Sequence, residues 1–285
     1  MSHMAGVEIT TLAILAIISL LVFAISLSKA IYFSSAGRLS KLSPEPRNLV
    51  PSVMSKSCSN LPILYSLQHC PYAMRARLGV LLAQQSVLIR AVVTKNKPAA
   101  MLAVSPKGTV PVLIIDHAEC GEVQHQKATI IDESIDIMLW ALRLNDPEDL
   151  LQAEDPSNLE SMLELIRTND KQFKPALEVY KLAKRFHKES EVQDRQHCEG
   201  FVAELERKLE SSDYLMGDQA SLADYALLPF VRQFARVDRK WYLQSPYPRL
   251  RDWLNRHLQM PLFTKAMAKY PLWLECHETF LLGRN

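Results

Sequence analysis

Residues 61 to 82 place a short apolar strand directly before a helix, with Cys70 and Pro71 at the boundary. Proline at the first helical position is pre-organised for the turn, so the helix is expected to begin there. The apolar residues of this helix should share one face, with Arg75 and Arg77 on another. The cysteine before it faces unpaired backbone N–H groups and the positive end of the helix dipole. This position favours a thiolate, with a pKa below the free value of about 8.5. A buried, inert cysteine is the alternative, but strand, Cys-Pro and helix together favour a nucleophile.

Strands and helices alternate as far as residue 145. A second strand over 87–93 would pair parallel with the first, because a helix connects them as a right-handed crossover. Pro111 cannot donate to a ladder, so it marks an edge, a bulge or a cis bond. The remaining predicted elements are a helix over 99–104, strands over 110–115 and 128–131, and a helix over 132–144. The pattern predicts an α/β domain over residues 61–145.

From Asp146 onward, apolar residues recur only at helical spacing, and no strand is expected. Ser221 and Asp224 have the spacing of a capping box, which would start one of these helices. We therefore predict an all-α domain over residues 146–285. Its helical periods fall in residues 159–165, 176–186, 198–209, 222–236 and 250–258.

The segment from Ile9 to Leu27 departs from the globular pattern, since it contains no charge, proline or glycine. Its length suffices to cross a bilayer. Basic residues follow it, which by the positive-inside rule places the folded part on the cytoplasmic side. A cleaved signal peptide is the alternative, but such a peptide needs a basic stretch before a shorter apolar core. We predict a tail over 1–6, a transmembrane helix over 7–33 and a Ser/Pro-rich tether over 34–60.

Composition excludes some classes of function. A net charge of +2, from 33 basic and 31 acidic residues spread along the chain, gives no reason to expect nucleic-acid binding. His117, Cys120 and His125 crowd one polar loop, but their spacing matches no standard zinc pattern and no metal is expected. The cysteines lie far apart without a CxxC pair, which is typical of reduced thiols. They are Cys58, Cys70, Cys120, Cys198 and Cys276.

Four short motifs share an order and spacing with one known family. They are Cys70-Pro71-Tyr72-Ala73, Lys95-Asn96-Lys97-Pro98, Thr109-Val110-Pro111-Val112 and Asp132-Glu133-Ser134. Over residues 61–285 the chain resembles the cytosolic glutathione transferases, in which a thioredoxin-like domain precedes a helical domain. Within that family it is most similar to the omega type and its glutaredoxin-like bacterial relatives. Residues 221–225 fit the capping motif of the helical domain.

The resemblance implies that glutathione is the co-substrate and that Cys70 is the catalytic residue. It also implies that Pro71, Tyr72 and Pro111 help to bind glutathione. Val110, before a cis Pro111, would offer its backbone to the cysteinyl unit as an added strand. Glu133 and Ser134, at a helix start, would receive the γ-glutamyl end. Lys97 would pair with the glycyl carboxylate. A solvated lysine and a simple helix-terminal glutamate are the structural alternatives for Lys97 and Glu133.

Ala73 stands where dithiol glutaredoxins have a second cysteine, so no resolving thiol is adjacent. The predicted function is therefore a membrane-tethered glutathione-dependent thiol transferase, working by monothiol exchange on a small-molecule or protein disulfide. His69 should point to the opposite face and is not expected to be the base. The aromatic residues of the helical domain could wall an acceptor pocket or belong to the core. They are Phe173, Tyr180, Phe186, Trp241 and Tyr242.

Other functions remain open at this point. Conjugation of electrophiles is disfavoured by a cysteine at the site, and a non-catalytic glutathione-binding scaffold would keep the fold without turnover. A channel-like role, suggested by the similar chloride intracellular channel family, is the weakest alternative. This alternative is weak because the apolar span precedes the fold and carries no polar groups besides hydroxyls, which would line a pore poorly. A homodimer is a further possible assembly.

Overall fold

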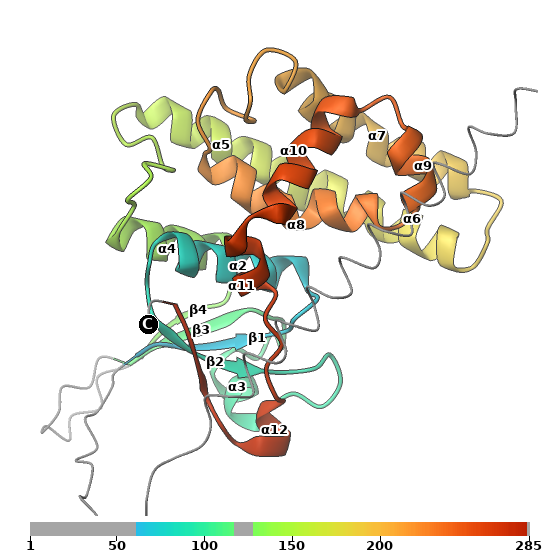
Figure 1. The fold of residues 1–285 in the computed structure, drawn as a ribbon. Helices are drawn as coiled ribbons and strands as arrows, with labels where there is room; N and C mark the ends of the chain where they lie inside the picture. The colour runs from blue at the N-terminus through green and yellow to red at the C-terminus, as the bar shows by residue number, and fades with distance from the viewer. Residues whose placement is uncertain (1–60, 117–127, 284–285) are drawn as a thin grey trace, which may run out of the picture. The chain divides into compact units, whose positions relative to one another are not determined.

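The computed structural model describes residues 61–116 and 128–283, and Figure 1 shows a small sheet beside a larger group of helices. The sheet has five strands in the order β4-β3-β1-β2-β5. The strands are β1 (Ile63–Ser66), β2 (Val87–Ala91), β3 (Val112–Ile115), β4 (Thr129–Ile131) and β5 (Phe280–Leu282). Strands β1 and β2 pair in parallel, with Leu64 opposite Ile89, and the other three pairings are antiparallel.

Two helices cover one face of the sheet: α2 (Pro71–Leu82) and α4 (Ser134–Leu144). Leu64, Ile89 and Leu113 of the sheet pack there against Val80 of α2 and Ile137 of α4. The opposite face carries the short helix α3 (Ala99–Val104), whose Met101 clusters with residues of β1 and β3. Alternating side chains of each strand thus serve two separate clusters, as the period of a strand requires.

Helices α2 and α4 pack closely because α2 has a glycine at the contact. A Cβ built on Gly79 would lie 2.6 Å from Cγ of Met138 and 2.7 Å from its Cα. Only a residue without a side chain fits there. The contact fixes the start of α4 relative to the start of α2, and both starts belong to the candidate site.

The helical part is built around α8 (Leu222–Ala235), which is buried along most of its length. The predicted capping box is present, since the Ser221 hydroxyl and backbone N–H both bond to the Asp224 carboxylate. Asp224 also accepts from the indole of Trp253 at 2.8 Å. The helices around α8 are α5 (Pro156–Thr168), α6 (Lys174–Arg185), α7 (Glu191–Lys208), α9 (Arg239–Gln244), α10 (Pro248–Gln259) and α11 (Pro261–Ala266). A π-helical turn, η1 (Asn169–Phe173), joins α5 to α6.

The C-terminal end corrects the prediction of an all-α domain over 146–285. After a short helix α12 (Trp273–Cys276), the chain returns to the sheet and adds β5 beside β2. Another correction concerns α2, where Arg75 and Arg77 were placed on a face apart from the apolar one. Both side chains are buried, because α2 lies between the sheet and the helical part.

Several predictions fall on residues outside the described part of the chain. These are the transmembrane helix over 7–33, the tether over 34–60, Cys58, and the loop with His117, Cys120 and His125. Within residues 61–116 and 128–283, no helix is both long enough and apolar enough to cross a bilayer. The same residues contain no cluster of three or more histidine, cysteine or acidic side chains that could hold a metal ion.

Candidate active site

Cys70 occupies the N-cap of α2, and Pro71 is the first helical residue, as the sequence predicts. The helix forms here because the Cys70 carbonyl accepts the first helical hydrogen bond from the Met74 N–H at 2.9 Å. Cys70 is partly exposed. Its Sγ lies 3.8 Å from the carbonyl oxygen of Val110. The residue is therefore not sealed in the core, and its sulfur lies beside the segment that leads into β3.

The bond between Val110 and Pro111 is cis, one of the conformations expected for this proline. Strand β3 begins only after it, at Val112. A turn at Gly108, whose φ is +63°, precedes this segment and favours a residue without a side chain. Cys70 and Val110 are thus neighbours in space although 40 residues separate them.

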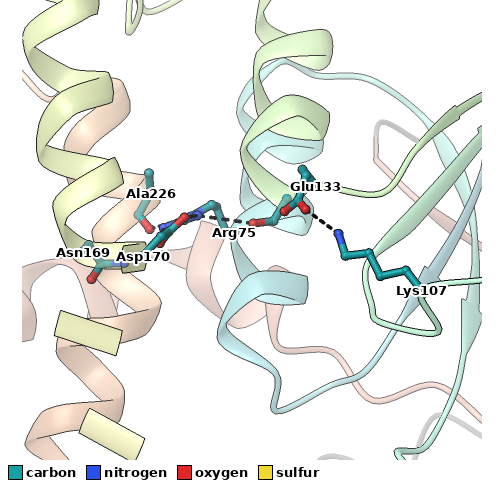
Figure 2. Close-up of polar contacts among 7 residues, drawn as sticks. Arg75, Lys107, Glu133, Asn169, Asp170 and Ala226 are labelled. Atoms are coloured by element: carbon teal, nitrogen blue, oxygen red, sulfur yellow. Dashed lines mark hydrogen bonds and ion pairs between the residues drawn. The ribbon is translucent and has the colours of Figure 1, made fainter. Parts of the chain in front are cut away.

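Glu133 and Ser134 stand at the start of α4, where they were predicted to bind the γ-glutamyl end. Glu133 forms an ion pair with Lys107, whose amine also donates to the Asp132 carbonyl at 3.2 Å. The Ser134 hydroxyl accepts a hydrogen bond from Arg75 at 3.3 Å. Figure 2 shows Lys107 and Glu133 at one end of a group of polar contacts that continues through Arg75. Both predicted residues therefore already have protein partners.

Tyr72 points toward the helical part. Its ring meets that of Phe230 edge-on, with 5.0 Å between the centroids. Burial, followed by the negative charge of Asp170, raises the pKa of Tyr72 to about 12. Cys70 and Glu133 also interact electrostatically with this phenol, so the three residues share one region. Tyr72 therefore keeps its proton at neutral pH.

Lys97 bonds within its own turn rather than to the other predicted site residues. Its amine donates to the carbonyl of Thr94 at 2.9 Å, within its own exposed turn. No contact between Lys97 and the predicted site residues occurs in the described part of the chain. A role for Lys97 in binding glutathione stays a prediction.

Three basic residues interact with Cys70, two from the helical part and one from α2 itself. Lys174, Lys181 and Arg77 all interact electrostatically with it. Burial, followed by the charge of Lys181, lowers the pKa of Lys174 to about 8. Burial also lowers the pKa of Arg77 to about 10, which leaves this guanidinium charged at neutral pH. An anionic sulfur at this position would meet a favourable field.

A cavity of about 490 Å³ has His69 and Pro71, the two sequence neighbours of Cys70, on its wall. The aromatic residues considered for such a pocket lie elsewhere: Phe173, Tyr180 and Tyr242 are core residues. Phe186 is exposed, and Trp241 lies under Arg195 at 4.3 Å. Three of the five aromatic residues therefore belong to the core, which is one of the two interpretations that the sequence left open. Basic side chains line the cavity instead.

Sequence reasoning missed Arg75, Lys107, Lys174 and Lys181. Lys107 had a local signal, because it lies in the turn just before the Val-Pro pair. The other three are brought to the site by packing between α2, α6 and α8, which no local pattern reveals. Arg75 illustrates this, since its two ion-pair bonds go to Asp170, 95 residues away.

Family models match both parts of the chain. The model of the glutathione S-transferase N-terminal domain matches residues 64–148, and that of the C-terminal domain matches residues 182–256. Together they cover more than half of the chain. Among curated proteins, none matches the chain.

Solved structures show the same fold at low identity. A glutathione transferase family member from Pseudomonas fluorescens pf-5, with two glutathione bound, is 15% identical, with a TM-score of 0.63 over 75% of this chain and 95% of its own. A Pseudomonas putida glutathione transferase with one glutathione disulfide bound per subunit is 16% identical, with a TM-score of 0.63 over 76% and 95%. Glutathione transferase Omega 2C from Trametes versicolor is 20% identical, with a TM-score of 0.59 over 74% and 94%.

Proposed function

Because the chain belongs to the glutathione transferase family, we propose that it is a glutathione-dependent thiol transferase in which Cys70 carries the exchange. The observation that supports this most is the position of the Cys70 sulfur. Cys70 is a partly exposed residue at the N-cap of α2, and its sulfur lies 3.8 Å from the Val110 carbonyl oxygen. Monothiol chemistry of the omega type follows from Ala73, which leaves no second thiol in this helix turn.

The reaction is a pair of thiol–disulfide exchanges. The Cys70 thiolate attacks the glutathionyl sulfur of a mixed disulfide, the substrate S–S bond breaks, and the leaving thiolate takes a proton from water. A glutathione thiolate then attacks the Cys70–glutathione disulfide. Glutathione disulfide leaves and the Cys70 thiolate is regenerated, so no further oxidant or reductant is needed. The cations Arg77, Lys174 and Lys181 would stabilise the anionic sulfur at both stages.

Glutathione would lie along the edge formed by the Val110–Pro111 segment and the start of α4. The Val110 backbone can pair with the cysteinyl unit, as an added strand does. The Ser134 hydroxyl accepts from Arg75 but keeps its own proton, which it can donate to the γ-glutamyl carboxylate. Lys107, paired with Glu133, adds a positive charge near the same helix start. Lys97 would need to leave its Thr94 contact to reach the glycyl carboxylate.

The central experiment compares Cys70→Ser with Cys276→Ser, a matched change at another partly exposed thiol. Reduction of the mixed disulfide of glutathione and 2-mercaptoethanol is measured with glutathione as reductant. We expect Cys70→Ser to lose activity by about a thousandfold or more, because the nucleophile is removed, and Cys276→Ser to retain it. After incubation with oxidised glutathione, peptide mass spectrometry should find one glutathionyl group on Cys70.

Three outcomes would reject the proposal. Undiminished turnover by Cys70→Ser would show that another group carries the exchange. Tight retention of glutathione with no reduction of any mixed disulfide would favour the scaffold alternative. Transfer of glutathione to an electrophile such as 1-chloro-2,4-dinitrobenzene, with no disulfide reduction, would favour conjugation.

We also propose that residues 7–33 anchor the protein in a membrane, with the folded part on the cytoplasmic side. The support is the uncharged segment Ile9–Leu27 and the basic residues that follow it. The full chain should remain in the membrane pellet after alkaline carbonate extraction, whereas a chain starting at residue 61 should be released. Recovery of the full chain in the soluble fraction would rule out the anchor.

A further inference from the structure

The cavity beside Cys70 lies between α2 and two helices of the helical part. His69 and Pro71, the residues on either side of Cys70 in the sequence, form one wall together with Met74, while α6 and the C-terminal half of α8 form the rest. Its volume, about 490 Å³, suffices for a small organic molecule. A molecule bound there would have its reacting end next to Cys70 and its remaining groups against α6 and α8.

The charged side chains that line this cavity are all basic. They are Lys181, Lys184 and Arg185 of α6, with Arg232 of α8 and Arg236 at its end. No described aspartate or glutamate contributes to the lining. A set of cations in a partly enclosed space creates a positive potential that attracts anions.

Carboxylates at the edge neutralise only part of this charge. Glu178 forms ion pairs with Lys174 and Lys181. Glu191 and Asp238 both contact Lys184, each at less than 3 Å. Within the described residues, Arg185, Arg232 and Arg236 form no ion pair. Three guanidinium groups therefore remain available to a ligand.

Helix polarity explains some of these cations but not their convergence. Basic residues near a helix C-terminus stabilise the helix dipole, and Lys184, Arg185 and Arg232 lie in last turns. That effect would operate equally if the side chains pointed to solvent in different directions. Here two helix ends direct them to one cavity beside the sulfur. Arg232 and Arg236 also border a second cavity, of about 370 Å³, whose other charged lining residues are Arg239 and Arg251.

We infer that this cavity holds the acceptor half of the substrate and selects acceptors that carry a carboxylate. The inference rests on the proposed function of Cys70 and adds the substrate class. In the first exchange, the Cys70 thiolate takes the glutathionyl group and the acceptor thiolate leaves into the cavity. The guanidinium groups of Arg232 and Arg236 would hold the acceptor's carboxylate, since a planar guanidinium can bind a carboxylate through two hydrogen bonds.

The test uses three mixed disulfides of glutathione that differ only in the charge of the acceptor. The acceptors are 3-mercaptopropionate, 2-mercaptoethanol and cysteamine, which are anionic, neutral and cationic. We expect kcat/KM to decrease in that order, with about a tenfold step from anionic to neutral, the usual size for a hydrogen bond to a charged group. Added salt should reduce this step, because it screens partly exposed charges.

Charge-removing variants locate the effect. The double variant R232Q/R236Q should lose the anionic preference while retaining turnover of the neutral acceptor. R232K/R236K keeps the charges and should keep most of the preference, which guards against a folding defect. Arg207→Gln, an exposed change on α7 away from the cavity, should behave as the unmodified protein. Equal kcat/KM for all three acceptors, or a preference that survives in R232Q/R236Q, would overturn the inference.

A binding measurement separates this inference from the proposed function. The thioether 3,3′-thiodipropionate has two carboxylates and no disulfide, so it can bind but not react. Calorimetry on Cys70→Ser should detect its binding, and R232Q/R236Q should weaken it about tenfold or more. Binding without turnover of any disulfide would reject the thiol transferase function and support the anion site. Turnover without charge preference and without binding would support the thiol transferase function and reject the anion site.

Discussion

Lys174 is a buried amine in a region that needs positive charge. Its side chain pairs with Glu178. Burial, followed by the charge of Lys181, lowers its pKa to about 8. Lysine in the unfolded chain titrates near 10.5. Between these two values the unfolded chain binds more protons than the folded one, so stability rises with pH in this window. Below about pH 8 the protein bears the full desolvation cost of the charge.

Lys174→Met should therefore stabilise the fold at pH 7, by about 1 to 2 kcal/mol. The gain should shrink from about pH 8 upward and vanish above the unfolded pKa, because the unmodified lysine is then neutral in both states. Urea unfolding at pH 7, 8.5 and 10 measures this difference. Lys171→Met, an exposed neighbour in η1, serves as the control and should change stability little at any pH. A pH-independent difference between Lys174→Met and the unmodified protein would contradict the assignment.

For single residues, the sequence predicted those features of the structure that neighbouring residues in the chain determine. The N-cap position of Cys70 follows from one adjacent proline, and the cis bond at Pro111 from a residue that cannot join a ladder. The hydrogen-bond partner of Lys97 does not follow from the sequence, because a flexible side chain has several possible partners and only the folded chain brings them near. Arg75 and Arg77 were misplaced for the same reason: their burial depends on α8 and on the segment after α11, far away in sequence.

At the scale of elements, the contact between α2 and α4 depends on one missing side chain. Gly79→Ala would place a Cβ 2.7 Å from the Cα of Met138, a backbone atom that cannot move alone. The two helices would have to separate. We expect a loss of about 1 to 3 kcal/mol in the free energy of unfolding, despite the higher helix propensity of alanine.

Gly200→Ala provides the opposite case in α7. A Cβ at Gly200 would meet no atom within 4 Å, so only propensity acts there. This variant should gain about 0.5 to 1 kcal/mol. Both variants are measured by chemical denaturation under one set of conditions. If Gly79→Ala were as stable as Gly200→Ala, the close approach of α2 and α4 would be wrong.

Elements with a strong local pattern were predicted within a few residues. The helix over 99–104 and the capping box at Ser221 agree with the structure, because the residues that predict each of them lie within that element itself. Strand β5 was missed because three residues are too few to show a period. Its partner β2 lies nearly 200 residues away, so its pairing is purely a tertiary effect.

At the scale of the whole molecule, one buried arginine joins the two parts of the fold. Arg75 of α2 donates two bonds of 2.7 Å to Asp170 of η1 and one of 3.0 Å to the Ala226 carbonyl of α8. It also donates to Ser134 of α4, and its guanidinium lies 4.4 Å from the ring centre of Phe230. Figure 2 shows Asp170 and Ala226 of the helical part close to Arg75. The same residue therefore positions the start of α4, where glutathione is proposed to bind.

A double-mutant cycle tests this role. Asp170→Ala leaves a fully buried guanidinium without its counter-charge and should cost about 3 to 5 kcal/mol. In R75M/D170A the buried charge is gone, and methionine can fill part of its space, so this double variant should be more stable than Asp170→Ala alone by about 1 kcal/mol or more. Urea unfolding followed by circular dichroism measures Asp170→Ala, Arg75→Met and the double variant.

The matched comparison is an exposed pair. Arg167 contacts Glu160 and Glu164 on the surface of α5, and Arg167→Ala should change stability by about 0.5 kcal/mol at most.

Because Arg75 also holds Ser134, Arg75→Met should raise the KM for glutathione more than it lowers kcat, whereas Arg167→Ala should change neither. Additive losses in the cycle would show that Arg75 and Asp170 act independently. An unchanged KM in Arg75→Met would separate the interdomain contact from glutathione binding.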